Sequence, residues 1–245
     1  MMASAIDLHK LYKTFNSNQV LRGLDLTIAA GEILTILGGS GTGKSVLLKL
    51  IIGLLKPDAG QILVEGEGIV PLQEEELLKV RRKVGMLFQG AALFDSMSVM
   101  ENVAFPLREH TRMTEGEVRD RVREVLALVG MAEVEEKLPS ELSGGMRKRV
   151  GLARAIALTP RIVLYDEPTT GLDPRNVDKI NELITTLRAK LQVTSVVVTH
   201  DIQSALRISD RVALLSDGRI ADTGTPAEIA QAEHPVVQEF LAGHL

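Results

Sequence analysis

Hydrophobic and polar residues follow two different periods along this chain. From residue 5 to residue 38, apolar side chains recur at about every second position, the period of a β-strand, with breaks at 16–18 and 30–31. Residues 32–38, EILTILG, form a nearly continuous apolar run that ends in glycine, which is typical of a buried strand entering a turn. Residues 43–55 then have apolar positions at helical spacing and stop before Lys-Pro. We therefore expect short strands first, and then a buried strand joined by a turn to a helix.

The rest of the chain shows a helical block between two regions where strands and helices alternate. Further strands are expected at 60–66 and 84–89, with a charged helix between them. From about 98 to 158 the spacing is helical in segment after segment. Strand-like runs return at 161–167 and 194–200, and a helical stretch follows each of them. This alternation predicts an α/β fold on a mostly parallel sheet, because parallel strands need crossover helices that cover the sheet.

The same pattern predicts how the domain is organised. The strands of the first 38 residues follow one another without helices, so we expect an antiparallel part there. Residues 90–158, approximately, are interpreted as a helical subdomain inserted into a lobe made of 1–89 and 159–245. No internal repeat, low-complexity stretch or linker interrupts the sequence, so we expect one domain over 1–245.

Composition and charge mainly exclude other classes of protein. The chain has no cysteine, which excludes disulfides and thiolate metal sites, and its net charge of −4 gives no electrostatic signature of nucleic-acid binding. The first residues lack a charged leader followed by an apolar run, so we expect no signal peptide. The longest apolar segment, 46–55, is too short to span a bilayer and contains Lys49. If the protein works at a membrane, other chains must supply the membrane-spanning segments.

A phosphate-binding loop is the strongest chemical signal in the sequence. Residues 38–45, GGSGTGKS, fit the pattern G-x-x-x-x-G-K-[ST] in full, between a predicted strand and a predicted helix, which disfavours a turn without a ligand. Glycines let the backbone wrap closely around phosphates. We expect a P-loop NTPase core that binds ATP with Mg²⁺, in which Lys44 contacts the β- and γ-phosphates and Ser45 ligates the metal. The residues expected at the nucleotide are Gly38, Gly39, Ser40, Gly41, Thr42, Gly43, Lys44, Ser45 and Val46.

Two later strands end in residues that suit phosphate chemistry. The run RIVLYDEP ends in Asp166 and Glu167, which alone would be interpreted as two solvated acids, but which beside a complete phosphate loop predict a metal ligand and a general base, respectively. His200 ends the strand TSVVVTH, at the strand end where open α/β sheets carry their ligand sites. We therefore expect His200 near the γ-phosphate.

A second anion-binding feature lies in ELSGGMRKRVGLARA, residues 141–155. Ser143, Gly144 and Gly145 begin a helical pattern, where backbone N–H groups point outward and favour an anion. The next three residues are Arg147, Lys148 and Arg149 after Met146. We expect these three basic residues to form a solvated helix face; the alternative is an electrostatic contribution to the anion site.

In these motifs and their order, the chain resembles the nucleotide-binding subunit of ATP-binding cassette (ABC) transporters over almost its whole length. The resemblance places the family's glutamine loop at Gln89, as a catalytic and metal-binding residue, and its switch histidine at His200. It implies catalytic roles for Glu167 and Lys44, a metal-binding role for Asp166, and an aromatic ring on adenine, for which we choose Phe15 over Tyr12. The signature motif matches Leu142, Ser143, Gly144 and Gly145, followed by Met146 where glutamine is usual, and the D-loop matches Gly171, Leu172 and Asp173.

This resemblance also implies a use for the second anion site. In the family, the signature of one chain closes on the ATP held by the phosphate loop of another, so a second copy of this chain is an expected partner. Two head-to-tail copies would bury two ATP molecules, and hydrolysis would remove the anion that joins them.

Within the family, residues 87–110 are similar to the ATPases of MCE-type (mammalian cell entry, Mla-like) systems. This implies ATP-driven phospholipid transport at the cytoplasmic face of the inner (plasma) membrane, where the chain is peripheral. The implied partners are an integral membrane permease that inserts a short helix into a groove near 90–108, an MCE-domain protein and a small regulatory subunit, with no nucleic acid. Four apolar residues are equally compatible with the groove and with the core: Leu93, Phe94, Phe105 and Leu107.

Two other functions use the same motifs. An ATPase of a polar amino-acid importer, or of another small-solute importer, would differ only in the stretch after Gln89. A non-transport ABC protein of DNA maintenance or translation usually has a coiled-coil insertion or two cassettes. Neither feature, and no basic stripe, occurs in this sequence.

Overall fold

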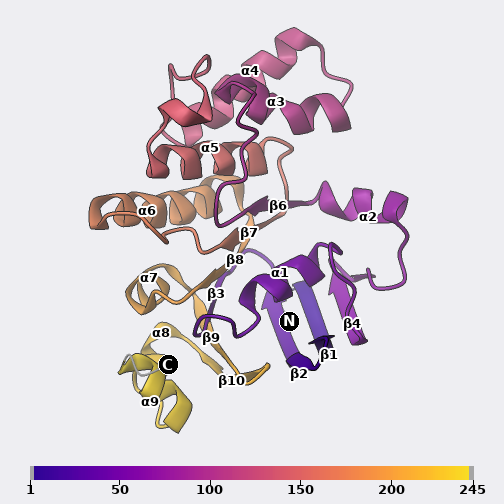
Figure 1. The fold of residues 1–245 in the computed structure, drawn as a ribbon, viewed down its shortest axis with the longest axis vertical. Helices are drawn as coiled ribbons and strands as arrows, with labels where there is room; N and C mark the ends of the chain where they lie inside the picture. The colour runs from indigo at the N-terminus through magenta and orange to yellow at the C-terminus, as the bar shows by residue number, and fades with distance from the viewer. Residues whose placement is uncertain (1–2, 243–245) are drawn as a thin grey trace.

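The computed structural model describes residues 3–242, in which two β-sheets lie side by side and helices stack at one end of the molecule (Figure 1). Residues 1–2 and 243–245, which belong to the single domain expected over 1–245, lie outside the described residues. Within that range, no helix is both long enough and apolar enough to cross a membrane.

The first sheet is four-stranded and antiparallel, in the order β2-β1-β4-β5. Its first two strands are each twelve residues long, so the expectation of short strands was wrong. Shifts of register along the β1–β2 pair let the two long strands stay paired while the sheet curves. The strands are β1 (Ser4–Phe15), β2 (Asn18–Ala29), β4 (Ala59–Val64) and β5 (Glu67–Gly68).

The second sheet is six-stranded, in the order β10-β9-β3-β8-β7-β6, and mostly parallel, as predicted. Every residue of β3, β7 and β8 is buried, which explains their continuous apolar runs. β9 and β10 form an antiparallel hairpin at one edge that the sequence pattern did not predict. The strands are β3 (Ile33–Leu37), β6 (Val84–Leu87), β7 (Ile162–Asp166), β8 (Thr194–Thr199), β9 (Arg211–Ser216) and β10 (Arg219–Gly224).

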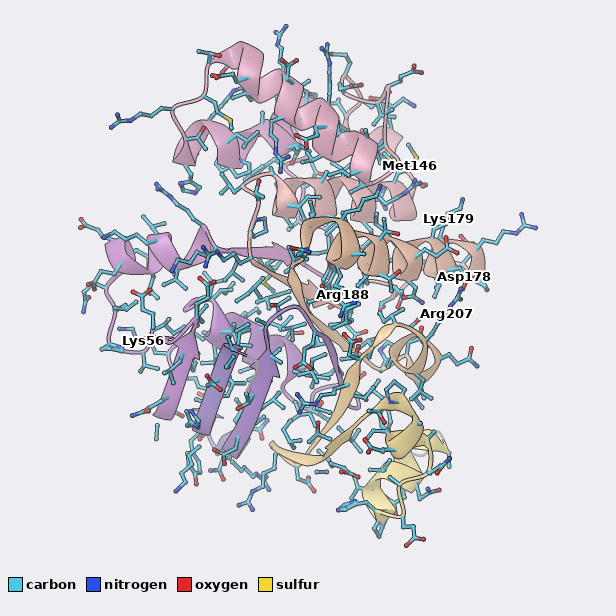
Figure 2. The ribbon with its side chains drawn as sticks, turned by 180° about the vertical axis from the view of Figure 1, so that it is seen from behind. Lys56, Met146, Asp178, Lys179, Arg188 and Arg207 are labelled. Carbon is cyan, nitrogen blue, oxygen red and sulfur yellow. The ribbon has the colours of Figure 1, made fainter. Side chains whose placement is uncertain are left out.

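Several helices begin at polar caps that the sequence supplies. Ser98 and Thr114 accept hydrogen bonds from backbone N–H groups three residues later, and each has a glutamate at that third position. Arg207 of α7 forms an ion pair with Asp178 of α6, which ties these two helices together (Figure 2). The helices are α1 (Lys44–Ile51), α2 (Glu74–Arg81), α3 (Val99–His110), α4 (Glu115–Leu128), α5 (Gly144–Ile156), α6 (Pro174–Leu191), α7 (Ile202–Ile208), α8 (Pro226–Ala230) and α9 (Pro235–Leu241), with a 3₁₀ turn at Pro139–Glu141.

Alternation along the central strands divides the interior into two main cores. Val163 and Tyr165 of β7 pack in the core that contains α3, α4 and α5, whereas Ile162 and Leu164 pack in the core shared with α1 and the first sheet. Strand β7 is thus buried on both faces, and its acidic residue, Asp166, lies at its carboxyl end. That end, with the ends of β3 and β8, carries the residues described next.

Candidate functional site

The three central strands bring the predicted motifs together at one edge of the sheet. β3 and β7 both pair with β8, in parallel, so the three carboxyl ends lie next to one another. Gly38 follows β3, Asp166 ends β7, and His200 follows β8. Residues more than a hundred positions apart in the sequence therefore meet at one place.

The loop at 38–43 is shaped for close approach to a ligand. Gly43 has φ +103°, and a Cβ there would lie 2.6 Å from a Val20 methyl carbon. A Cβ on Gly38 would lie 2.7 Å from the Leu215 carbonyl oxygen, which no side chain tolerates without a shift. Lys44 is 6% exposed, and its ammonium donates hydrogen bonds to the carbonyls of Gly38 (2.7 Å) and Gly39 (2.9 Å). Burial lowers the pKa of Lys44, which its neighbouring carboxylates partly oppose.

Two adjoining cavities lie over this loop. The first, of about 270 Å³, is lined by Val20, Ser40, Gly41, Gly43, Lys44, Ser45, Val46, Gln89 and Glu167. The second, of about 230 Å³, shares Val20, Ser40 and Gly41 with the first, and its lining also includes Asn18. Phe15 pairs with Asn18 in the hairpin, and its ring is exposed. Val20 was not among the predicted residues, although it is an apolar residue of β2 that a planar ligand can contact.

The position of Tyr12 separates it from Phe15. The Tyr12 ring lies over Gly23, so close that a Cβ there would meet the hydroxyl oxygen at 2.7 Å. Phe15 instead lies at the end of the hairpin, with the Lys13 ammonium 5.3 Å from its ring centre. Neither ring lines the second cavity, but the strand partners of both residues do, Asn18 for Phe15 and Arg22 for Tyr12.

Ser45, which lines the first cavity, contacts a carboxylate behind it. The Ser45 hydroxyl donates to the Asp166 carboxylate at 2.8 Å, and the carboxylate is almost buried. Mg²⁺ prefers oxygen ligands and is usually held by one or two protein carboxylates together with water and substrate phosphates. Ser45 and Asp166 fit such an ion. Gln89 lines the same cavity from the loop after β6.

Glu167 is at the centre of the hydrogen-bond network. Its Oε2 accepts a hydrogen bond from Thr170 Oγ1 at 2.9 Å. The same oxygen lies 2.9 Å from His200 Nδ1 and 3.4 Å from Thr199 Oγ1. Its other oxygen, Oε1, lies 3.5 Å from Lys44 Nζ. The backbone of Glu167 is left-handed, with φ +47°, a conformation that costs about 1–3 kcal/mol for a residue with a side chain. The sequence did not reveal Thr170 or Thr199. The available signals were their positions, three residues after Glu167 and directly before His200.

Lys148 corrects one expectation. It was predicted to lie on a solvated helix face, but it is 6% exposed, and its ammonium donates to the Glu167 carbonyl oxygen at 2.9 Å. Burial lowers its pKa, although Asp166 and Glu167 act in the opposite direction. The physical reason is helical spacing, because Lys148 lies one turn after the buried Gly145 and so on the inward face of α5. Arg147 is exposed, as predicted.

The signature stretch lies outside the first cavity of its own chain. Ser143 caps α5 and accepts a hydrogen bond from the backbone N–H of Met146 at 3.3 Å. Leu142 is buried, and Met146 packs against the helical core at the start of α5 (Figure 2). Among the described residues that line the cavity at Lys44, none comes from 142–146.

The expected D-loop lies beside the signature. A Cβ on Gly144 would lie 3.7 Å from a Leu172 methyl carbon, and Leu172 packs against the helical core. Asp173 caps α6, and the hydrogen bond from the Asn176 side chain is the main reason that its pKa is lowered. Gly171 has φ +78° and forms the turn before them.

Comparison with known proteins decides the family. A family model described as "ABC transporter" matches residues 21–170. The chain belongs to the ABC transporter family. This confirms the resemblance, the P-loop fold and the expected activity, so the chain is an ATP-hydrolysing subunit.

Relatives of this ABC ATPase match it from end to end. The "probable ribonucleotide transport ATP-binding protein mkl" of Mycobacterium tuberculosis is 45% identical over 99% of this chain and 67% of the relative. The "intermembrane phospholipid transport system ATP-binding protein MlaF" of Haemophilus influenzae is 42% identical over 99% of this chain and 92% of the relative. A solved dimer of the ATP-binding cassette MJ0796, bound to ADP and Pi, has a TM-score of 0.84 and 35% identity, covering 90% of this chain and 98% of the other.

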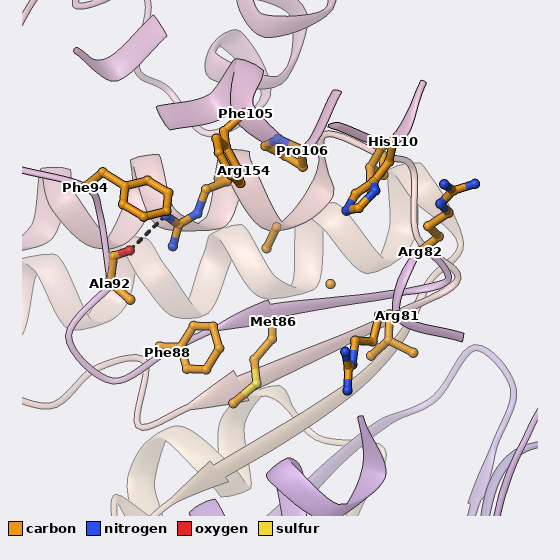
Figure 3. Close-up of a pocket in the computed structure, with 14 residues that line it drawn as sticks. Arg81, Arg82, Met86, Phe88, Ala92, Phe94, Phe105, Pro106, His110 and Arg154 are labelled. Carbon is orange, nitrogen blue, oxygen red and sulfur yellow. Dashed lines mark hydrogen bonds between the residues drawn. The ribbon is translucent and has the colours of Figure 1, made fainter. Parts of the chain in front are cut away.

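A separate groove of about 370 Å³ lies between α3, α5 and β6 of this ABC ATPase (Figure 3). The rings of Phe94 and Phe105 face each other at 5.1 Å between centres, and both side chains are exposed. Arg154 of α5 lies beside Phe94 and donates to the carbonyls of Ala91 (2.9 Å) and Ala92 (2.8 Å). Those two alanines have positive φ, so one guanidinium fixes two consecutive left-handed residues at the edge of the groove.

The four apolar residues that the sequence left between groove and core divide between the two. Phe94 and Phe105 line the groove. Leu107 is buried, and Leu93 packs partly buried against the helical core.

Proposed function

We propose that this ABC ATPase powers phospholipid transport of the MCE type, as a pair of identical chains bound to a membrane permease. The observation that carries the proposal is the likeness to MlaF, a phospholipid transport ATPase, over 99% of this chain and 92% of that one. By the same likeness, the chain acts at the cytoplasmic face of the inner membrane. An MCE-domain protein and a small regulatory subunit are further proposed partners.

The separation of the two anion sites supports the paired arrangement. None of the described residues that line the cavity at Lys44 comes from the signature, so we infer that the signature meets an ATP held by another chain. The MJ0796 cassette, with the same fold, is a dimer in its ADP- and Pi-bound state. A head-to-tail pair with two-fold symmetry places each signature opposite the partner's phosphate loop. We retain the division into a lobe of 1–89 and 159–245 and a helical subdomain of about 90–158 as part of this proposal.

The roles of the site residues follow from their contacts. Lys44, within reach of both the loop and Glu167, binds the β- and γ-phosphates, and Phe15 stacks on adenine. Ser45, Asp166 and Gln89 would hold Mg²⁺, which when bound neutralises charge on the phosphates. Glu167 accepts the proton of the attacking water. His200 orients that carboxylate through the 2.9 Å contact.

A second candidate function has its own supporting observation. The mycobacterial relative, at 45% identity, carries a name that refers to ribonucleotide transport. A small polar solute is therefore the alternative cargo. Under this alternative, the chain would serve a small-solute transporter, of which polar amino-acid importers are another example.

The deciding experiment is purification of the chain with its membrane partner in detergent, followed by extraction of bound lipid. We expect a permease and phospholipid to co-purify, and we expect phospholipid vesicles to raise the ATPase rate of the reconstituted complex. A complex that contains no phospholipid and responds to a small polar solute would favour the second candidate.

A groove variant tests the permease contact itself. Phe105→Asp places a charge in the apolar groove, so we expect the permease to be lost from the purified complex. Leu54→Asp is the matched control, because Leu54 is also exposed but lies in the turn after α1 and does not line the groove. ATP binding by the isolated variants checks that they fold. If the permease co-purifies equally with both variants, the groove is not the docking site.

The stretch around the groove can also be exchanged. Replacing residues 90–108 by the same stretch of an amino-acid-importer ATPase should abolish assembly with the original permease. Unchanged assembly would show that this stretch does not select the transporter.

A further inference from the structure

Lys148 has contacts that the proposed catalytic scheme does not use. Its side chain is buried, its ammonium lies 2.9 Å from the Glu167 carbonyl oxygen, and the same carbonyl receives only a long contact of 3.4 Å from the Thr170 N–H. A buried charge is costly unless it is paired and hydrogen-bonded. Here the hydrogen bond goes to the Glu167 carbonyl, and the negative charges of Asp166 and Glu167 partly oppose the lowering of the Lys148 pKa by burial.

The carbonyl that Lys148 holds belongs to a residue with an unfavourable backbone. Glu167 has φ +47°, and its N–H donates to the Val198 carbonyl at 3.0 Å. Its carboxylate is held separately, by His200 and Thr170. Three sets of contacts therefore fix one residue, and Lys148 supplies the one that starts from the signature helix.

We propose that Lys148 is a positioning residue, which holds the backbone of Glu167 so that its carboxylate points at the attacking water and which links the signature helix to the catalytic carboxylate of the same chain. This inference rests on the proposed role of Glu167 as the general base. Among the described residues that line the nucleotide cavity, Glu167 is present and Lys148 is not. Loss of Lys148 should therefore reduce turnover and leave ATP binding almost unchanged.

The test compares variants of the full chain, alone and bound to its permease. Lys148→Met keeps the length of the side chain but removes the donor and the charge, and we expect kcat to fall about 10- to 100-fold with KM for ATP nearly constant, as for a small misplacement of a catalytic group. Lys148→Arg restores a cationic donor and should recover part of kcat. Arg121→Met is the matched control, because Arg121 is also largely buried and donates to backbone carbonyls, those of Ile156 and Ala157 at the far end of α5. It should lower the unfolding temperature without lowering kcat.

Single-turnover rates in a Glu167→Gln background separate this inference from the assignment of Glu167. If Lys148 acts through Glu167, then Lys148→Met should add no further loss once the carboxylate is gone. The same fold-loss in both backgrounds, or a wild-type kcat for Lys148→Met alone, would overturn the positioning role while leaving Glu167 as the base. Wild-type turnover by Glu167→Gln alone would instead remove the base assignment, and the inference with it.

Discussion

The phosphate loop and the signature are both proposed as anion sites at helix N-termini, but they are built differently. The helix after the phosphate loop begins at Gly43, which has a left-handed backbone and no side-chain cap, and a buried lysine accompanies it. The signature helix is capped by Ser143, whose hydroxyl accepts a hydrogen bond from the backbone N–H of Met146. Its neighbouring cations donate elsewhere, Arg147 to the Leu142 carbonyl and Lys148 to that of Glu167.

This difference indicates a division of work. The phosphate loop has a cation, a wrapped backbone and an adjoining cavity, so it can bind a nucleotide by itself. The signature offers the helix dipole and one hydroxyl, so we expect it to bind phosphate weakly and to act on a nucleotide already held by a phosphate loop. Substitutions in the phosphate loop should therefore weaken ATP binding, whereas substitutions in the signature should slow hydrolysis.

The largest effect on ATP hydrolysis is expected at Glu167, the proposed general base for the phosphate that both sites contact. Glu167→Gln should lower ATP hydrolysis by roughly 10²–10⁴-fold, the usual loss for a positioned base, while both anion sites remain intact. ATP should therefore hold two chains together for longer, which size-exclusion chromatography with ATP can measure. Rapid hydrolysis by this variant would contradict the assignment.

The signature should fail in hydrolysis and not in binding. Ser143→Arg places a bulky side chain on the closing surface, so we expect hydrolysis to fall about 10²-fold, comparable to the loss of a transition-state donor. ATP affinity of the isolated chain should stay near wild type in equilibrium binding. Thr114→Arg makes the same change at the exposed cap of α4 and should leave hydrolysis unaffected. A mixed pair of wild-type and Ser143→Arg chains with two working sites would contradict the shared arrangement.

The phosphate loop should fail in binding. Lys44→Ala removes charge-assisted hydrogen bonds to the phosphates, so the Kd for ATP should rise roughly 10- to 100-fold, the equivalent of about 1.5–3 kcal/mol. Titration with a fluorescent ATP analogue measures this directly. An unchanged Kd would mean that Lys44 does not contact the ground-state phosphates.

The smallest difference concerns folding. Gly38→Ala should lower the free energy of unfolding by about 1–3 kcal/mol, because its Cβ would meet the Leu215 carbonyl at 2.7 Å. Gly144→Ala should change it by less than about 0.5 kcal/mol, since the nearest atom is a Leu172 methyl carbon at 3.7 Å. Urea unfolding of the two variants compares them. Equal losses would mean that the signature glycine is as constrained within one chain as the loop glycine.

The sequence predicted what depends on local pattern and failed where contacts come from distant residues. The ends of β3, β7 and β8 were placed correctly because continuous apolar runs identify buried strands, and parallel strands place their ends together. Lys148 was misplaced because three basic residues in a row look solvated unless the packing of their helix is known. Thr170 and Thr199 were missed because hydroxyls gain meaning only from the carboxylate they face. The hairpin of β9 and β10 lacks a central apolar run on its outer strand, so no strong signal announced it.

Helix α5 has one further consequence. It runs unbroken from its cap at Ser143 past Arg154, a distance of roughly 16 Å at 1.5 Å per residue. A stiff rod of this kind that tilts about its middle moves its two ends in opposite directions. Because Arg154 holds the carbonyls of Ala91 and Ala92, a shift of that loop would be accompanied by a shift of Ser143 at the opposite end of the helix.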